Sequence, residues 1–496
     1  MRPPHVFPLL NADRRERYLV CALAVALVLI RSIVATSYEG FFFDSDQAIV
    51  GLMARRLSSF REFPLFYYGL NYLLAVEAWI ITPFFWIARS SVTVMRLPFV
   101  ALNAIAAVWL VAALTSSMRL SPRLAFVSAL PFVMPTPAAA NHLLELAGAC
   151  VEPFIYILAL WMLRRRPFAF GAVLAIAYLH REFAIFAVPA LAIVEWREWI
   201  PLSRERVMRL VSSAAGFALV WLIVDDVKMH LAGGTLALQM ASLRGQICLD
   251  AAEIRRHARA LVTEALPALY GARRMPLSAF RMNSPVTVGW PIVGWFVAAT
   301  LAVAIARVVF QRPPRRQSAE DATPTGFGSY LALVGAFTAC AYPLSCNTAP
   351  GSLPLFRYLL LALLLPVGCA AVFFQRERSV LLQRIVAAVF VLWASFNLFD
   401  NMRVLRAAVA DPPGSEHRAL VDYLLEHRIR YARAIYWDAY VVDFLSRERV
   451  ITASVDVIRI PEYQKLVEDH AAAAVNLDRL PCEGRERVAS WCVEKP

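Results

Sequence analysis

The chain has 496 residues, of which 59% are hydrophobic and 18% are charged. A soluble globular domain is roughly 45–50% apolar and about 25% charged, so the composition excludes a soluble fold of this size. It also excludes a disordered chain, a disulfide scaffold and a collagen-like fibre. The chain is therefore predicted to be a polytopic membrane protein. Its formal net charge of +13 first indicates basic loops that face anionic lipid, and only second a nucleic-acid partner.

Apolar segments follow one another along the first 400 residues, and a membrane-spanning helix needs about 20 of them in a row. Eleven segments are predicted to span, and the two between residues 168 and 194 are short. No cleavable signal precedes the first span, which is therefore expected to be retained. The predicted spans are Tyr18–Ser37, Leu97–Leu114, Leu124–Ala140, Ala149–Leu163, Phe168–Leu179, Phe183–Val194, Leu210–Val224, Val286–Phe310, Phe327–Cys346, Leu355–Phe374 and Val380–Phe399.

Arginine placement predicts the orientation, because cytoplasmic loops carry an excess of Lys and Arg. Six arginine clusters fall on one side of the predicted spans, so this side, with the N-terminus, is predicted to be cytoplasmic. The segment Tyr72–Ala88 is apolar enough to span, but an ordinary span there would move every later cluster to the other side. It is interpreted as a helix that lies in the outer interface or re-enters it. The clusters are Arg14, Arg15 and Arg17; Arg119 and Arg123; Arg164–Arg166; Arg197, Arg204, Arg206 and Arg209; Arg312, Arg315 and Arg316; and Arg376, Arg378 and Arg384.

The predicted fold class is an all-α polytopic membrane bundle with about 11 transmembrane helices and outer interfacial helices. The bundle takes residues 1–400, with a first outer loop at 38–96 and a second large outer loop at 225–285. The polar tail, 401–496, mixes helix-like and strand-like stretches, which predicts a small α/β C-terminal domain on the outer face. The tail contains Cys482 and Cys492. An oxidising compartment allows a disulfide between them, and whether they pair is left open.

Two carboxylates, Asp44 and Asp46, follow the first span where it meets the outer surface. An amphipathic helix is expected after them, and either carboxylate is suited to cap its N-terminus. The alternative is a general base, because a carboxylate in a partly dry cleft accepts a proton from an attacking hydroxyl. A D-x-D pattern alone does not decide between the two.

The context of these carboxylates resembles the first outer loop and second span of GT-C glycosyltransferases. The resemblance is strongest over residues 41–194. It is closest to bacterial members related to protein O-mannosyltransferases, aminoarabinose transferases and lipopolysaccharide-modifying galacturonosyltransferases, which are multi-span enzymes that use polyprenyl-phosphate sugars. It returns weakly at Arg357-Tyr358-Leu359 and at residues 436–449. The motifs are Asp44-Ser45-Asp46-Gln47-Ala48, Gly51-Leu52-Met53-Ala54-Arg55, Phe66-Tyr67-Tyr68-Gly69-Leu70-Asn71-Tyr72, Val76-Glu77-Ala78 and Met95-Arg96-Leu97-Pro98.

The resemblance implies a catalytic role for Asp46, which matches the family's catalytic aspartate, with Asp44 as the reserve candidate. The family usually has a glutamate next, and this chain has Gln47. The amide weakens the case for a metal at this pair, so no metal ligand is assigned, and a divalent metal cofactor is left open.

Four further residues are implied to contact the sugar or the acceptor. Tyr68 and Asn71 lie where members often read Tyr-Gly-Gln, and Glu77 and Glu152 match acidic positions. For Glu77 the alternative is a carboxylate that reaches the lipid headgroups.

Basic residues on the outer side are the candidates for the donor phosphate. In the family, a basic residue at the turn His180-Arg181-Glu182 faces this phosphate, and the planar fork of Arg181 suits a bidentate contact. Arg357 is a second candidate, with an interfacial anchor as the alternative. Arg31, in the outer half of the first span, is expected to face the bundle and pair with a carboxylate or a phosphate.

Two other groups have weaker claims to a function. His142 and Glu145, three residues apart, share a helix face that suits a metal, but no third ligand accompanies them. Tyr436, Trp437 and Tyr440 are suited to stack on a sugar, although such aromatics are more often part of a core.

The implied function is transfer of a sugar from a polyprenyl-phosphate donor to an acceptor hydroxyl of a lipid, glycan or protein. The reaction is placed on the outer leaflet of a bacterial inner membrane, with inversion at the anomeric carbon and without a nucleic-acid partner. The sequence has neither a Gly-rich phosphate loop nor a G-x-G-x-x-G fingerprint. The alternatives are a transporter or flippase of lipid-linked sugars and a non-catalytic member that binds them.

Overall fold

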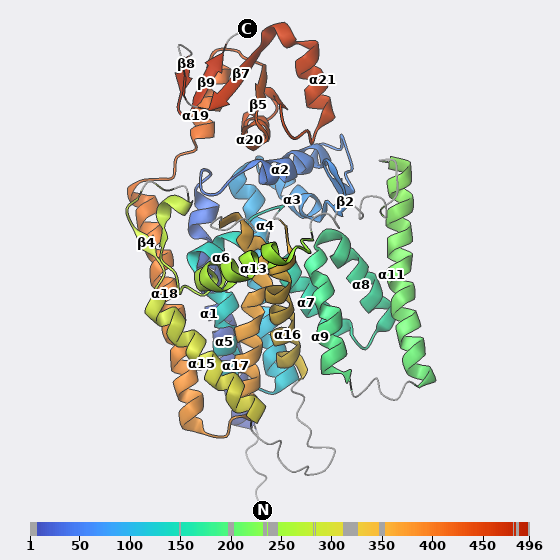
Figure 1. The fold of residues 1–496 in the computed structure, drawn as a ribbon, viewed down its shortest axis with the longest axis vertical. Helices are drawn as coiled ribbons and strands as arrows, with labels where there is room; N and C mark the ends of the chain where they lie inside the picture. Colours follow the sequence, from blue (N-terminus) through green and yellow to red (C-terminus); the bar gives the residue numbers. More distant parts are fainter. Residues whose placement is uncertain are drawn as a thin grey trace, which may run out of the picture.

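The computed structural model describes residues 7–147, 150–196, 203–231, 236, 247–280, 282, 284–310, 326–346, 353–479, 481–482 and 486–494. A helical bundle forms the larger part of the molecule. A small domain formed by the C-terminal residues lies at one end of the long axis, and the beginning of α1 (Phe7–Ser37) lies at the other (Figure 1).

Each of the eleven predicted spans is largely helical. Within the described residues, six helical segments are long and apolar enough to cross a membrane. Shorter apolar helices lie alongside them (Figure 1). The six segments lie in α1 (Phe7–Ser37), α4 (Val92–Met118), α11 (Arg204–Leu231), α16 (Gly326–Ala341) continued by the 3₁₀ helix η5 (Tyr342–Leu344), the 3₁₀ helix η6 (Leu353–Leu363) continued by α17 (Leu364–Arg376), and α18 (Val380–Ala410). The shorter ones are α5 (Pro122–Val133), α7 (Glu152–Leu163), α8 (Pro167–His180), η1 (Glu182–Phe186) with α9 (Ala187–Val194), and α15 (Pro291–Phe310).

The predicted span Leu124–Ala140 is not one helix. It divides into α5 and the short α6 (Pro137–His142). Met134, which ends α5, has φ −134° and ψ 67°. A residue before proline is disfavoured in the helical region, and Pro135 follows Met134, so the helix ends there.

Ion pairs join the ends of helices near the basic clusters. Arg123 Nε lies 2.7 Å from Glu16 Oε1, Arg164 Nε lies 3.1 Å from Glu195 Oε1, and Arg307 Nη2 lies 3.1 Å from Glu377 Oε2. The beginning of α1 and the turn between α17 and α18 lie at the end of the molecule opposite the C-terminal domain (Figure 1). Which end faces the cytoplasm stays a prediction.

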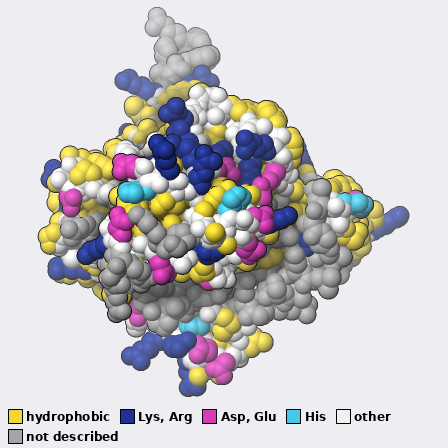
Figure 2. All heavy atoms as spheres, turned by 90° about the horizontal axis from the view of Figure 1, so that it is seen from above, with side chains coloured by type: hydrophobic (Ala, Val, Ile, Leu, Met, Phe, Trp, Pro, Cys, Tyr) yellow, Lys and Arg dark blue, Asp and Glu magenta, His cyan; other side chains and the backbone are white. Residues whose placement is uncertain are grey.

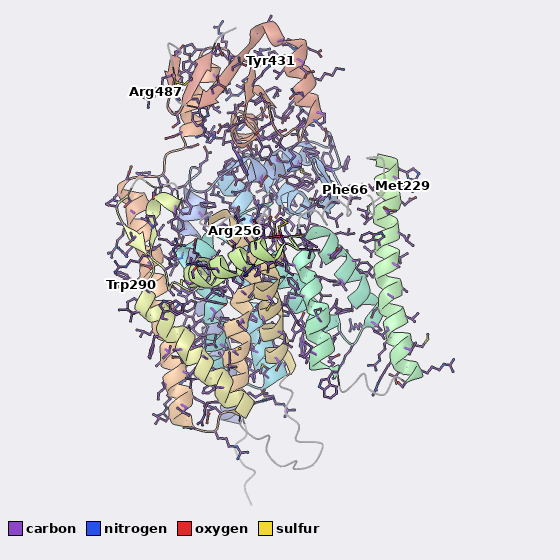
Figure 3. The ribbon with its side chains drawn as sticks, in the orientation of Figure 1. Phe66, Met229, Arg256, Trp290, Tyr431 and Arg487 are labelled. Carbon is purple, nitrogen blue, oxygen red and sulfur yellow. A yellow bond between two sulfur atoms is a disulfide. The ribbon has the colours of Figure 1, made fainter. Side chains whose placement is uncertain are left out.

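The first outer loop forms a layer between the bundle and the C-terminal domain (Figure 1). Its elements are α2 (Ser45–Ser58), the strand pair β1 (Phe66–Tyr67) and β2 (Leu70–Leu74), and α3 (Val76–Ile87). The segment Tyr72–Ala88 therefore contains the end of a strand and a helix of 12 residues, too short for an ordinary span. Met229 of α11 lies level with Phe66 of β1 (Figure 3), so the end of α11 reaches this layer.

The C-terminal domain is a small α/β unit, as predicted. Its five-stranded sheet has the order β6-β5-β7-β9-β8. β5 is parallel to β6 and β7, and β9 is antiparallel to β7 and β8. The strands are β5 (Tyr431–Ala434), β6 (Ile451–Ser454), β7 (Ala474–Arg479), β8 (Glu486–Val488) and β9 (Trp491–Glu494); the helices are α19 (Glu416–Glu426), α20 (Tyr436–Ser446) and α21 (Pro461–Asp469). Charged side chains of both signs gather on the face seen from above this domain (Figure 2).

The domain boundary predicted at residue 400 lies inside α18, which continues to Ala410. Two disulfides are present. Cys482 pairs with Cys492, and Cys248 pairs with Cys346, a pairing that the sequence did not indicate. Of these four cysteines, Cys248, Cys482 and Cys492 lie in segments predicted to be outside, and Cys346 ends a predicted span.

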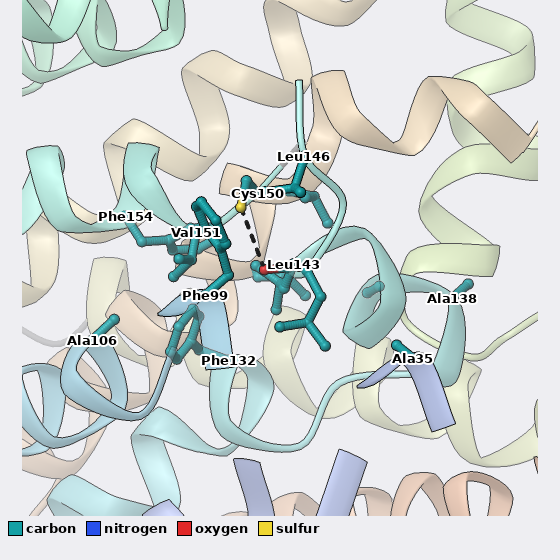
Figure 4. Packing of buried hydrophobic residues seen from close by; sticks show 14 of the residues in the cluster. Ala35, Phe99, Ala106, Phe132, Ala138, Leu143, Leu146, Cys150, Val151 and Phe154 are labelled. Carbon is teal, nitrogen blue, oxygen red and sulfur yellow. Dashed lines mark hydrogen bonds between the residues drawn. The ribbon is translucent and has the colours of Figure 1, made fainter. Parts of the chain in front are cut away.

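The hydrophobic core of the bundle extends to the layer that α2, β1, β2 and α3 form. Phe99 of α4, Phe132 of α5 and Phe154 of α7 are buried there, and the rings of Phe132 and Phe154 are 4.9 Å apart (Figure 4). Cys150 lies in the same cluster with its Sγ 3.9 Å from the carbonyl oxygen of Leu143. This close packing supports the layer of α2, β1, β2 and α3 rigidly.

Candidate active site

The N-terminus of α2 places the two candidate aspartates in different roles. Asp44 is the N-cap residue, and its Oδ1 accepts a hydrogen bond of 3.1 Å from the backbone N–H of Gln47. The carboxylate satisfies a backbone donor that the helix itself leaves without a partner. The capping interpretation is therefore correct for Asp44.

Asp46 lies in the first turn of α2, where three segments distant in sequence meet. Its Oδ1 accepts a hydrogen bond from the hydroxyl of Tyr436, at the start of α20. Its Oδ2 lies 3.7 Å from Nη1 of Arg357 in η6. The backbone carbonyl of Asp46 accepts a 2.9 Å bond from the hydroxyl of Tyr67 in β1. The side chains of Asp46 and Arg357 are 21% and 27% exposed, so this ion pair remains open to solvent.

Gln47 does not face outward beside Asp46. Its Nε2 donates a 2.5 Å bond to the carbonyl of Phe42, and its Oε1 accepts a 3.3 Å bond from Arg96. Arg96 also donates to the carbonyls of Phe41 and Ala35. An amide both donates and accepts, which an ionised carboxylate cannot do. Gln47, the residue that departs from the family pattern, thus stabilises the turn between α1 and α2.

A second cluster lies among α3, α7 and α8. Arg181 donates directly to Glu77, and their side chains are only 6% and 5% exposed. Glu77 also accepts from the backbone N–H of Ala147 at 2.9 Å and 3.1 Å. The alternative of a carboxylate at the headgroups is therefore wrong for Glu77, because its oxygens are satisfied inside the protein. Arg181, the predicted phosphate ligand, already has a carboxylate partner.

Glu152 and His180 complete this cluster. Glu152 is buried, and the thiol of Cys150 faces its carboxylate. His180 Nδ1 lies 2.9 Å from the hydroxyl of Tyr156. The rings of Phe183, two residues after Arg181, and Tyr358, next to Arg357, meet edge to face at 5.7 Å. This ring contact joins η1, which follows the second cluster, to η6, which supplies Arg357.

One set of described residues has the donors for a metal ion. Glu77, Glu152 and His180 each offer a ligand atom, and these atoms lie within 4.8 Å of one another. Two carboxylates and an imidazole suit a zinc-like ion. Arg181 already neutralises one carboxylate, however, so the fit is partial. The predicted pair of His142 and Glu145 bond to each other and are not part of this set.

Arg31 has a different partner from the one expected. Its Nη2 donates a 2.7 Å bond to Oδ1 of Asn103, and its guanidinium lies 5.5 Å from the ring centre of Phe132. No described carboxylate bonds to it, so the expectation of a carboxylate partner was wrong. At this level the neighbouring helix α4 presents the amide of Asn103. Nε and Nη1 of Arg31 are buried without a partner among the described residues, and a phosphate partner of Arg31 stays a prediction.

Of the two neighbouring tyrosines of the hairpin, Tyr67 contacts Asp46 and the predicted Tyr68 does not. The hydroxyl of Tyr68 donates to Glu62, and its ring lies 5.9 Å from the guanidinium of Arg56. Asn71 belongs to β2, and its side chain lies outside the described residues.

The aromatic residues of α20 divide between core and surface. Tyr436 and Tyr440 are buried and Trp437 is exposed, so the core interpretation is right for the two tyrosines. Tyr436 nevertheless reaches the site through its hydroxyl. The sequence contains no local signal for this contact, nor for that of Tyr67.

The comparisons with known proteins concern the fold. No family model and no curated protein matches the chain. Among solved structures, ArnT from Cupriavidus metallidurans bound to undecaprenyl phosphate is similar at a TM-score of 0.53 and 10% identity, over 95% of this chain and 97% of that one. ArnT from the same organism in the apo state gives a TM-score of 0.33 at 10% identity, over 91% and 88%. The first comparison confirms the predicted fold class: the chain has the GT-C-like fold of ArnT, an aminoarabinose transferase.

Proposed function

We propose that the chain is an integral membrane glycosyltransferase that moves a sugar from a polyprenyl-phosphate donor to an acceptor hydroxyl. The observation that carries the proposal is the carboxylate of Asp46, held by Tyr436 and partly open to solvent beside Arg357. Support from the fold comes from its similarity to ArnT, which was solved with undecaprenyl phosphate bound.

In the proposed reaction, Asp46 acts as general base. The acceptor oxygen attacks the anomeric carbon from the face opposite the phosphate, and its proton passes to the carboxylate. The bond between that carbon and the phosphate oxygen breaks, and the electron pair leaves with the phosphate. The products are the glycosylated acceptor, with the anomeric carbon inverted, and polyprenyl phosphate, which needs no general acid because it is a stable anion.

Among the candidates, Arg357 is best placed to bind the donor phosphate. Its guanidinium is 3.7 Å from Asp46 and more than a quarter exposed, so a phosphate can approach without breaking a direct ion pair. Stabilising the developing negative charge is electrostatic catalysis. Arg181 would first have to leave Glu77, and Arg31 lies deeper, against Asn103. His180 is hydrogen-bonded to Tyr156. Like Arg181, it is therefore less available to the donor phosphate than Arg357.

The proposed location is a bacterial inner membrane, with the N-terminus in the cytoplasm and the C-terminal domain outside. The disulfide in the C-terminal domain, and the one that holds Cys248 of the second outer loop, favour this orientation, because disulfides persist in oxidising compartments. A membrane-impermeant thiol reagent should label Lys465→Cys in intact cells and Arg165→Cys only after lysis, in a background with Cys340 replaced by serine. The reverse pattern would overturn the orientation.

The enzymatic proposal is tested with purified protein in lipid and a panel of labelled polyprenyl-phosphate sugars. We expect transfer by the unaltered chain and a loss of about 10²–10⁴-fold in Asp46→Asn, the range that general-base catalysis contributes. Asp44→Asn is the matched variant, because asparagine caps helices as well as aspartate, and it should retain activity. Release of polyprenyl phosphate that survives both substitutions would remove the base assignment. Movement of intact donor between leaflets without transfer would favour a flippase.

A further inference from the structure

The C-terminal domain donates a hydrogen bond to the candidate base from the hydroxyl group of Tyr436. Tyr436, the first residue of α20, donates to Asp46 Oδ1 across a separation of 390 residues. We propose that Tyr436 is a positioning residue for Asp46, so that the C-terminal domain completes the active site rather than only covering it. This inference rests on the proposed function in that Asp46 is taken as the base.

The backbone of Tyr436 is fixed on both sides. Its N–H donates a 2.7 Å bond to Asp456 Oδ1, and its carbonyl accepts a 2.5 Å bond from the hydroxyl of Ser45. Since Ser45 directly precedes Asp46, the same two residues of α2 hold Tyr436 at its carbonyl and at its hydroxyl. The tyrosine therefore has one position relative to the carboxylate.

The side chain of Tyr436 is equally confined. It is 5% exposed, its ring meets that of Tyr440 at 5.5 Å, and the guanidinium of Arg459 lies 5.7 Å from its centre. Burial, together with the charge of Asp46, raises the pKa of Tyr436 well above its ordinary value. The hydroxyl therefore keeps its proton at neutral pH and remains a donor to the carboxylate.

α2 and α20 are in close contact along their length. The packing of the two helices therefore fixes the position of Tyr436 relative to Asp46. A Cβ atom at Gly51 of α2 would lie only 2.5 Å from a ring carbon of Phe444 in α20, so a larger residue would separate the helices. Further along α2, Arg56 makes ion pairs with Glu448 at 3.5 Å and Glu462 at 2.9 Å, both in the C-terminal domain.

The hydrogen bond from Tyr436 decides which carboxylate oxygen of Asp46 faces the acceptor. It occupies Oδ1, so that Oδ2, beside Arg357, is left to take the proton of the acceptor. The other groups facing Asp46 are Tyr67, Arg357 and Arg459. Arg459 is also hydrogen-bonded to the side chain of Tyr436, so a variant of Tyr436 changes the surroundings of Arg459 as well.

The test is Tyr436→Phe, which removes only the hydroxyl. We expect kcat to fall about tenfold, because a carboxylate that loses its hydrogen bond from Tyr436 is no longer held in one position toward the acceptor. The KM for the donor should change less than kcat, because the hydroxyl acts on the base and not on the phosphate. The matched variant is Tyr440→Phe, whose hydroxyl accepts from the backbone N–H groups of Arg459 and Ile460. It should lower thermal stability and leave kcat in place.

A second measurement does not need turnover. The infrared difference spectrum between the unaltered chain and Asp46→Asn isolates the carboxylate stretching band of Asp46, whose frequency depends on the hydrogen bonds that the carboxylate accepts. The band should shift in Tyr436→Phe and stay in place in Tyr440→Phe. An unchanged band together with an unchanged kcat in Tyr436→Phe would overturn the inference while leaving Asp46 as the base. If no donor is turned over, the proposed function fails, and the infrared band still decides whether Tyr436 acts on Asp46.

Discussion

Two of the ion pairs between an arginine and a carboxylate differ in their distance and in their exposure to solvent. Asp46 and Arg357 are 3.7 Å apart and about one quarter exposed, whereas Glu77 and Arg181 are in direct contact and nearly completely buried. An open pair can exchange one partner for a ligand at little cost. A buried pair cannot, because the charge left behind has no solvent to stabilise it. We infer that the first pair serves the chemistry and the second holds α3 against α8.

The largest effect is expected from breaking the buried pair. Glu77→Gln leaves the guanidinium of Arg181 without its direct carboxylate partner and should lower the free energy of unfolding by about 3–5 kcal/mol. Thermal or denaturant unfolding in detergent measures this loss. Asp46→Asn is the matched variant and should change stability by less than about 1 kcal/mol, since it breaks a pair that is open to solvent and not in direct contact. A larger loss of stability in Asp46→Asn than in Glu77→Gln would reverse the comparison.

A smaller and different effect is expected at the arginine of the open pair. Arg357→Gln should raise the KM for the polyprenyl-phosphate donor by about 10–100-fold, because a hydrogen bond to a charged group contributes about 1.5–3 kcal/mol. The melting temperature should stay the same. The same substitution at Arg181 should mainly lower the melting temperature. If Arg181→Gln raised the donor KM at unchanged stability, Arg181 and not Arg357 would be the phosphate ligand.

The smallest effect is expected from removing metal ions. Arg181 already provides a positive charge to Glu77, so incubation with a strong chelator should leave both the transfer rate and the melting temperature unchanged. Elemental analysis of the purified protein checks the same point directly. A stoichiometric metal ion that is lost in Glu152→Gln would show that the buried cluster is a metal site.

Composition and periodicity were enough to predict the bundle and the small α/β domain, because both depend on where apolar residues gather along the chain. The division at Pro135 was missed, although a proline inside an apolar run is a visible signal. The single residues Glu77, Arg181 and Asp46 were found from motifs. Their partners were not, because the pairs Glu77–Arg181 and Asp46–Tyr436 are separated by 104 and 390 residues. Contacts of that range depend on how the helices pack, which one sequence does not reveal.

The separation between Asp46 and Tyr436 also bears on how the protein is made. At about 5–20 residues per second, the ribosome adds Tyr436 roughly 20–80 seconds after Asp46. During that interval the nascent chain already contains the proposed base but lacks the hydroxyl group that is proposed to position it. A chain that stalls or is clipped before α20 would thus contain every predicted span and still lack a part of the proposed active site. On the proposed function, activity would therefore require synthesis to reach the C-terminal domain.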